Sequence, residues 1–207
     1  MTTCKIFRHD LIGELDEKKA KGVLEALTAA EKRGSPRSTF ELYIESEGGY
    51  ANEWHRIAYR FLNAKIRIRT VVHKLAYSAA AEIFALGDER AVGEDVDLMY
   101  HKTLILTAFG AFTVSTIRKF LEKGDIRDDQ RRALSFISFP FMSTKRLNLL
   151  ELISNAEECN RMSRDFLAHK LRSEVIDELI VEGEDKYLKA REALELGVAT
   201  KIVSRQK

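Results

Sequence analysis

Segments with the patterns of strands and of helices alternate along the first hundred residues, and this alternation constrains the fold more than any other feature. Residues 5–13, 39–46, 66–73 and 96–102 have the β-branched and aromatic composition of strands, and helical segments separate them. In residues 16–33 the apolar side chains recur at the spacing of one helix face. The β-α-β-α-β-α-β order predicts an α/β fold with a largely parallel sheet and right-handed crossovers.

The second half of the chain has a different pattern. Residues from about 112 to 182 look almost wholly helical, with apolar residues at helical spacing. A final helix at 189–197 precedes a short strand at 199–204. Gly197 stands where helices commonly end on a residue in the left-handed conformation.

The length of 207 residues suits one domain of moderate size. We expect a single domain over residues 1–207. Its α/β core would comprise residues 1–111 and 173–207, and residues 112–172 would form a helical handle or insertion.

Composition excludes several classes of partner. The 34 Lys and Arg residues nearly balance 32 Asp and Glu, so the charge gives no case for binding nucleic acid or a membrane. The apolar runs at 104–112 and 136–142 are too short to cross a bilayer, and the N-terminus lacks the apolar region of a secretory signal. Cys4 and Cys159 fit reduced thiols better than a disulfide. These features predict a soluble, cytoplasmic protein without a metal or another cofactor.

Three short motifs carry the candidate chemistry. Gly48 and Gly49 follow a predicted strand, where glycine lets backbone N–H groups face a ligand oxygen. Ser78 begins a predicted helix, whose first N–H groups, such as that of Ala79, have no partner within the helix. His101 ends the next strand, at the sheet edge where active sites of open α/β folds collect. Taken singly, such a serine is usually an N-cap, such a histidine a packed residue and such glycines a turn.

The order and spacing of the three motifs resemble the Clp protease proteolytic subunit (ClpP) family. The stretch LYIESEGGYANEWHRIAYRFL at 42–62 is similar to the family's Gly-Gly block, and VVHKLAYSAAAEIFALGDERAVGEDVDLMYHK at 71–102 is similar to its serine–histidine block. The ending KYLKAREALELGVATKIV at 186–203 also looks like that of the family. The resemblance covers residues 5–102 and 173–205.

The resemblance implies a fold, an activity and a site. The fold would be the spiral of β-β-α units that ClpP shares with crotonases, and the subunits would form a homo-oligomeric ring that cleaves peptides or unfolded proteins. Ser78 would be the nucleophile and His101 the general base, with the N–H groups of Gly49 and Ala79 as the oxyanion hole. The short N-terminus leaves little room for the axial loops that gate the family's pore, which argues against dependence on an ATPase unfoldase.

The chain departs from the family pattern beside the nucleophile. Lys74 and Glu47 replace a motif glycine and a motif proline, and Tyr77 directly precedes Ser78. Side chains of this size are expected to narrow or reshape the substrate groove.

The acidic third member of the triad is a second departure. The family's aspartate falls on Ile180 or Val181 here. Four carboxylates lie nearby in the sequence: Glu178, Glu182, Glu184 and Asp185. Of these we predict Glu182 as the third member of the triad.

The interval after His101 is a third departure, because it is longer than the family's single handle helix. It includes the apolar segments ILTAFGAFT and SFISFPFM, within residues 104–145. One interpretation is an extra helix or two packed on the same core. The other is a changed oligomer interface, since exposed apolar surface commonly marks contact with a partner.

Three other functions stay open at this point. The chain could be a catalytically silent Clp-like subunit that helps to assemble a ring, for which the missing aspartate argues. It could be a crotonase-type acyl-CoA enzyme, which would not need this serine and histidine. It could also be a serine–lysine peptidase, with Lys102 or a helical lysine such as Lys145 as the base.

Overall fold

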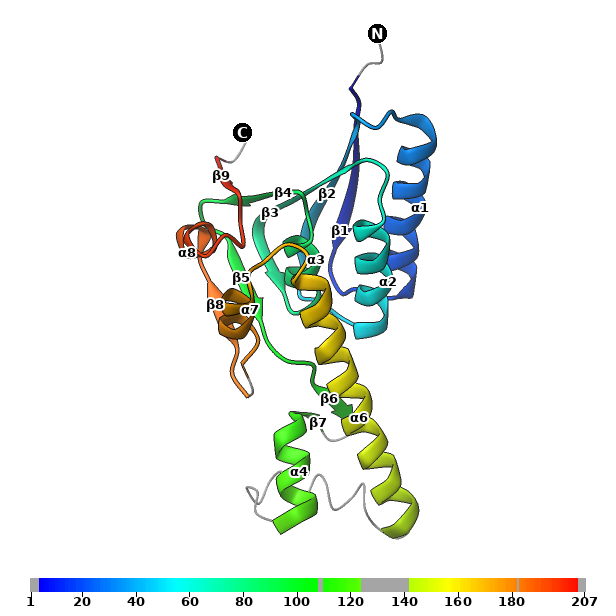
Figure 1. Cartoon of the computed structure of the whole chain (residues 1–207), viewed down its shortest axis with the longest axis vertical. Helices are drawn as coiled ribbons and strands as arrows, with labels where there is room; N and C mark the ends of the chain where they lie inside the picture. The colour runs from blue at the N-terminus through cyan, green and yellow to red at the C-terminus, as the bar shows by residue number, and fades with distance from the viewer. Residues whose placement is uncertain (1–3, 108–109, 124–141, 182, 205–207) are drawn as a thin grey trace.

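The computed structural model describes residues 4–107, 110–123, 142–181 and 183–204 (Figure 1). Its strands are β1 (Ile6–Ile12), β2 (Thr39–Ser46), β3 (Arg67–Tyr77), β4 (Glu89–Gly93), β5 (Asp97–Tyr100), β6 (Ile105–Thr107), β7 (Gly110–Phe112), β8 (Lys186–Leu188) and β9 (Lys201–Val203). Its helices are α1 (Glu17–Arg33), α2 (Ala51–Leu62), α3 (Ala79–Ala85), α4 (Val114–Lys123), α6 (Met142–Leu167), α7 (Ser173–Leu179) and α8 (Ala190–Glu195).

The main sheet is largely parallel, as the sequence predicts. Its central path runs β1-β2-β3-β4-β9, and every neighbouring pair along it is parallel. The long strand β3 pairs with β4 along its first half and with β5 near its end, where Tyr77 lies opposite Met99. β8 joins β5 in antiparallel orientation. The end of β3 therefore brings the segment before Ser78 beside the strand that leads to His101.

Helices α1, α2 and α3 cover one face of this sheet (Figure 1). The predicted apolar face of α1 is confirmed, because Ala20, Val23 and Leu27 are fully buried. Trp54 and Ile57 of α2 are buried in the same core. The 3.6-residue spacing of apolar residues in the sequence thus correctly predicted both helices.

The other face of the sheet is polar. Side chains of β2 alternate between buried apolar residues and partly exposed polar ones. On the polar face Arg69 pairs with Glu41 at 2.8 Å and with Glu89 at 3.2 Å, and Arg8 also pairs with Glu41 at 2.9 Å. Because the described helices that pack on these strands cover one face, the strands show the alternation that is more typical of antiparallel sheets.

Strand β4 was not predicted, because a buried arginine interrupts its apolar pattern. The Arg90 guanidinium donates to the carbonyl oxygens of Val198 at 2.7 Å, Gly87 at 2.8 Å and Gly197 at 3.0 Å. These bonds attach the C-terminal segment to the sheet. Gly197 has a φ of +75°, which confirms its predicted left-handed conformation after α8.

Replacing Arg90 with methionine is expected to lower the free energy of unfolding by about 2–4 kcal/mol, because three buried carbonyl groups lose their donor. Urea denaturation of both proteins measures the difference. The control is Arg191→Met, which removes an arginine whose side chain is 88% exposed and should change stability by about 0.5 kcal/mol or less. Equal effects of the two substitutions would contradict this role of Arg90.

A second, smaller core lies in a lobe that projects from the main domain (Figure 1). The hairpin of β6 and β7, helix α4 and α6 contribute to it, and its buried members are Ile105, Phe112, Val114, Ile117, Ile153 and Ala156. The expectation of an almost wholly helical segment from about 112 is correct for α4, α6 and α7. The hairpin just before that segment was not predicted, and residues 124–141 lie outside the described part of the chain. No helix in the described ranges, the long α6 included, is apolar enough to cross a membrane.

Candidate active site

Ser78 occupies a strained turn between β3 and α3. Its φ of +54° and ψ of −127° make it the only non-glycine residue with positive φ among the residues described. Such a conformation costs on the order of 1–3 kcal/mol and persists only where neighbouring structure holds it. Here the Ser78 N–H donates to the Met99 carbonyl at 2.7 Å, and the Ser78 carbonyl accepts from Glu82 N–H at 3.1 Å.

The Ser78 side chain does not cap the helix that it precedes. Its hydroxyl makes no hydrogen bond to the first turn of α3 or to any other described residue. The common N-cap interpretation of such a serine therefore does not hold here. A strained serine at a strand-to-helix turn, with a free hydroxyl, is the arrangement of a nucleophile elbow.

The Gly48–Gly49 turn passes directly beside this serine. A Cβ on Gly48 would lie 2.6 Å from the Tyr77 carbonyl oxygen and 2.9 Å from the Ser78 Cβ, so only glycine fits. The Gly48 N–H donates to the Ser46 hydroxyl at 3.1 Å. By contrast, no hydrogen bond between described residues uses the N–H of Gly49 or of Ala79. Gly49 and Ala79 both line the pocket.

His101 follows the end of β5 and is held from two sides. The buried Tyr100 donates its hydroxyl to the Ala81 carbonyl at 3.0 Å, which ties the end of β5 to α3. Beyond the histidine, the Thr103 N–H donates to Asn160 of α6 at 2.7 Å. The His101 Nδ1 lies 2.5 Å from the Lys102 carbonyl oxygen. Because a carbonyl oxygen can only accept, Nδ1 carries a proton, and the neutral form of the imidazole then has its lone pair on Nε2.

These residues line one pocket of about 490 Å³ between the main domain and α6. Ser78, Ala79, Gly49 and His101 lie on the main-domain side, and the α6 side supplies mainly small and apolar residues, namely Leu152, Asn155, Ala156, Cys159 and Ser163. The structure thus brings together four of the five predicted site residues. No hydrogen bond joins Ser78 to His101 in the described structure.

None of the described acidic candidates near the end of α7 lines the pocket. Glu178 instead pairs with Lys186 at 2.7 Å, while Glu184 and Asp185 are exposed. The predicted third member, Glu182, lies outside the described residues. The only described hydrogen-bond partner of His101 is thus the backbone carbonyl of Lys102.

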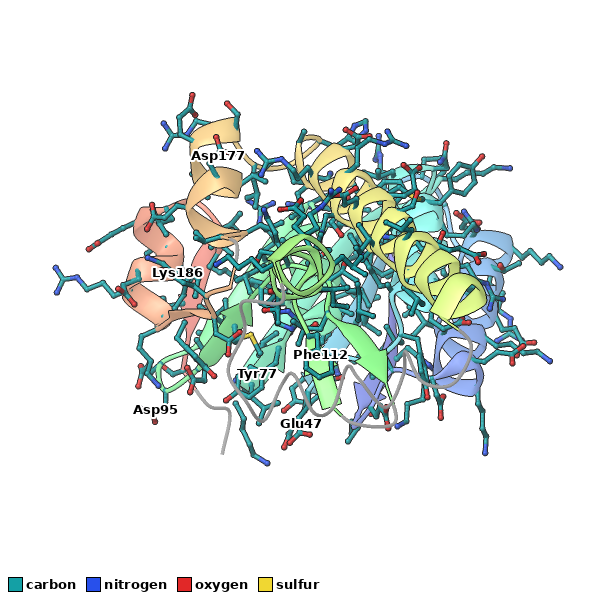
Figure 2. The ribbon with its side chains drawn as sticks, turned by 90° about the horizontal axis from the view of Figure 1, so that it is seen from below. Glu47, Tyr77, Asp95, Phe112, Asp177 and Lys186 are labelled. Atoms are coloured by element: carbon teal, nitrogen blue, oxygen red, sulfur yellow. The ribbon has the colours of Figure 1, made fainter. Side chains whose placement is uncertain are left out.

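The residues that replace the family's small ones have different surroundings. Lys74 pairs with Glu45 at 2.7 Å, and Tyr77 packs edge-on against Tyr187, with 6.2 Å between the ring centroids. Neither lines the pocket, and the expectation that the larger side chains narrow or reshape the substrate groove stays a prediction. Glu47 does line it. In the view of Figure 2, Glu47 and Tyr77 project onto the same region of the molecule as Phe112 of the hairpin.

Glu82 is a lining residue that sequence reasoning missed. It lies one helical turn after Ser78, and its side chain is buried among apolar residues of α3. Burial raises the pKa of Glu82 to about 7, and hydrogen bonding from the Ser163 side chain opposes this shift. The available signal was a single charged residue inside the apolar helix AAAEIFA.

The raised pKa of Glu82 predicts a pH-dependent effect on stability. The unfolded chain loses this proton near pH 4.5, whereas the folded protein keeps it up to about pH 7, so ionisation opposes folding progressively across that window. Glu82→Gln removes the ionisation. The change in the free energy of unfolding caused by this substitution is expected to be more favourable at pH 8 than at pH 4 by about 3 kcal/mol. Urea denaturation at both pH values tests this, and an effect independent of pH would contradict the raised pKa.

No group of three or more histidine, cysteine, aspartate or glutamate side chains within the described ranges is placed to hold a metal ion. The groups that the sequence predicts to act together here are the Ser78 hydroxyl, the His101 imidazole and the N–H groups of Gly49 and Ala79, and all four residues line this pocket.

A mixed α/β domain with a largely parallel sheet, and with this serine turn at the end of a strand, has the architecture of ClpP-like folds. The model of the Clp protease family matches residues 4–123, which is more than half of the chain. The protein therefore belongs to the Clp protease family, which supports a ClpP-like peptidase in general terms. No curated protein matches the chain significantly. The resemblance of the C-terminal residues 173–205 lies outside the family match and stays a prediction.

Proposed function

We propose that this protein is a serine endopeptidase in which Ser78 attacks the peptide bond and His101 transfers the protons. The observation that carries the proposal is the strained Ser78, with its free hydroxyl, in one pocket with His101 and two unpaired N–H groups. Strain of this kind persists where the surrounding structure enforces it, and it concentrates at active sites.

In the proposed mechanism, Ser78 Oγ bonds to the scissile carbonyl carbon while His101 Nε2 takes the hydroxyl proton. The N–H groups of Gly49 and Ala79 stabilise the resulting oxyanion, each by about 3–4 kcal/mol. The C–N bond then breaks, the imidazolium gives its proton to the leaving amine, and Ser78 retains the acyl group as an ester. Water hydrolyses this ester by the same steps, with His101 again as the base.

The Lys102 carbonyl would serve in place of an acidic third member. By accepting from Nδ1 it fixes the tautomer that leaves Nε2 free to take a proton. A neutral carbonyl stabilises the imidazolium less than a carboxylate does, so a slower enzyme is expected than one with a complete triad. The hydrogen bond between Ser78 and His101 would form when substrate binds, as such bonds commonly tighten only in the complex.

Fluorophosphonate labelling followed by intact mass measurement tests the proposal. The wild type should gain a single adduct, Ser78→Ala none, and His101→Ala far less in the same time. An adduct that persists in Ser78→Ala would contradict the assignment. Labelling that survives His101→Ala but not Lys102→Ala would favour the serine–lysine alternative, although Lys102 does not line the pocket. The side chain of Lys145 lies outside the described part of the chain.

The second candidate is a catalytically silent subunit, which the missing Ser78–His101 hydrogen bond favours. Members of the Clp protease family generally form oligomeric rings, and we propose a homo-oligomeric ring that acts on peptides or unfolded proteins for this chain too. Well-folded wild-type protein that gains no adduct, yet assembles into rings in analytical ultracentrifugation, would favour the silent subunit.

A further inference from the structure

The carboxyl group of Glu82 is the least satisfied polar group in the pocket. The residue is only 7% exposed, and its Oε2 atom is buried without a hydrogen-bond partner in the described structure. The other six residues of α3 are apolar and buried. Burying an unpaired carboxyl group is costly, and native structures rarely keep one without a function.

The surroundings hold this carboxyl in place but satisfy only one side of it. The Trp54 indole N–H donates to the Ser163 hydroxyl at 3.2 Å, and Ser163 in turn hydrogen bonds to the Glu82 carboxyl. Ser163 is itself 3% exposed. These contacts connect α2 through α6 to α3, and Oε2 remains without a partner among the described residues.

Among the described residues, none that lines the pocket is a lysine or an arginine that could compensate Glu82. Its ionisable neighbours are Tyr100 of β5 and Cys159 of α6. Burial raises the pKa of both groups, and nearby acidic groups, Glu82 among them, add to the shift, so both are neutral near pH 7. Apart from Glu82 and Cys159, the charged or titratable side chains that line the pocket in the described part of the chain are Glu47, Tyr50 and His101. The pocket therefore favours a cation.

The position of Glu82 fixes which part of a substrate would reach it. The Glu82 N–H donates to the Ser78 carbonyl at 3.1 Å, and both residues line the pocket, so the Glu82 carboxyl lies near the candidate nucleophile. A substrate side chain next to the scissile bond would enter the same pocket. Its aliphatic part would contact Trp54, Ile105 and Leu152, which are lining residues.

We propose that Glu82 makes this pocket a recognition site for a lysine or arginine side chain, at the substrate residue that Ser78 acylates. This inference rests on the proposed function for its place in the reaction, but the binding step does not require catalysis. The cationic group would donate to Oε2 and neutralise the carboxylate, while its aliphatic part fills the apolar remainder of the pocket. Below pH 7 binding would release the Glu82 proton, so affinity for the cation rises with pH.

The single tryptophan of the chain, Trp54, offers a direct measurement, because it lines the pocket and bonds to the partner of Glu82. Trp54 fluorescence is followed at pH 8 in Ser78→Ala protein, which excludes turnover. The ligands are the acetylated methylamides of arginine, lysine, glutamine and leucine. The cationic ligands should bind at least 10-fold more tightly than the other two, and Glu82→Gln should bring this ratio close to one.

Glu47→Gln is the matched control, because Glu47 is the other acidic lining residue but is exposed. The preference for cations should persist in this variant. Three results would overturn the inference: equal binding of leucine and arginine ligands, a preference that survives Glu82→Gln, or no binding of any ligand at millimolar concentration. Tighter binding of the glutamine ligand would instead assign a neutral amide to the pocket.

A second measurement connects recognition to the reaction. Labelling rates with peptide phosphonates that carry lysine or leucine next to the phosphorus are compared in wild type and Glu82→Gln. The lysine-to-leucine ratio should fall at least 10-fold in the variant. An equal loss for both probes would show that Glu82 acts on Ser78 rather than on the side chain. Failure of a small fluorophosphonate to label Ser78 would count against the proposed function and leave the fluorescence result to decide the binding site.

Discussion

Replacing Ser78 with alanine is expected to lower kcat for peptide hydrolysis by about 10⁴- to 10⁶-fold, and adding His101→Ala should lower it no further. Both side chains take part in the transfer of the same proton, so removing either one abolishes the contribution of the other to catalysis. The activity that remains would come from substrate binding and from the N–H groups of Gly49 and Ala79. Kinetics of the two single variants and the double variant on one fluorogenic peptide measure this.

The control is Ser173→Ala, because Ser173 is exposed on α7 and does not line the pocket. Losses in the two single variants that multiply in the double variant would show that Ser78 and His101 act independently. That result would contradict the shared role of the two residues in the proposed mechanism.

Gly48→Ala is expected to lower the free energy of unfolding by about 2–4 kcal/mol and kcat/KM by at least about 100-fold. The new Cβ would meet the Tyr77 carbonyl oxygen at 2.6 Å, at a φ of +94° that side chains rarely adopt. The chain can relieve this clash only by moving the turn away from Ser78. Such a movement would displace the Gly49 N–H, and misplacing a catalytic group by about 1 Å can cost about 100-fold in rate.

Gly197→Ala separates the clash from the backbone strain. Gly197 also has positive φ, at +75°, but nothing lies within 4 Å of its would-be Cβ. This control should cost about 1–2 kcal/mol, which is the penalty of the left-handed conformation alone. Urea denaturation and peptide kinetics of both variants provide the comparison. Equal costs for the two substitutions, with activity retained in Gly48→Ala, would contradict the role of the close approach.

Local patterns predicted the part of the fold that depends on nearby residues. The buried face of α1 and the alternation of β2 follow from the spacing of residues such as Val23 and Leu42, because one face of each element meets the core. Strand β4 was missed because its buried Arg90 finds partners in the distant segment around Val198. No local pattern contains that pairing.

The candidate site also has a part that the sequence predicted and a part that depends on contacts between distant residues. The spacing of Gly49, Ser78 and His101 was informative through the family resemblance, and the structure brings these residues to one pocket. The partner of His101 Nδ1 could not be predicted, because any residue can supply a backbone carbonyl. Glu82 was not recognised because its partner Ser163 lies on α6, far along the chain.

Helix α6 belongs to two cores at once. Its 26 residues span about 39 Å. Ile153 and Ala156 pack in the core of the lobe, and Leu167 packs in the main core. Between them, Asn160 accepts a hydrogen bond from the segment after His101. The helix therefore connects the lobe to the main core along one wall of the pocket. A force on the lobe would shift the pocket wall and the histidine segment together. Contacts made far from Ser78 could in this way set how well the serine and histidine are aligned.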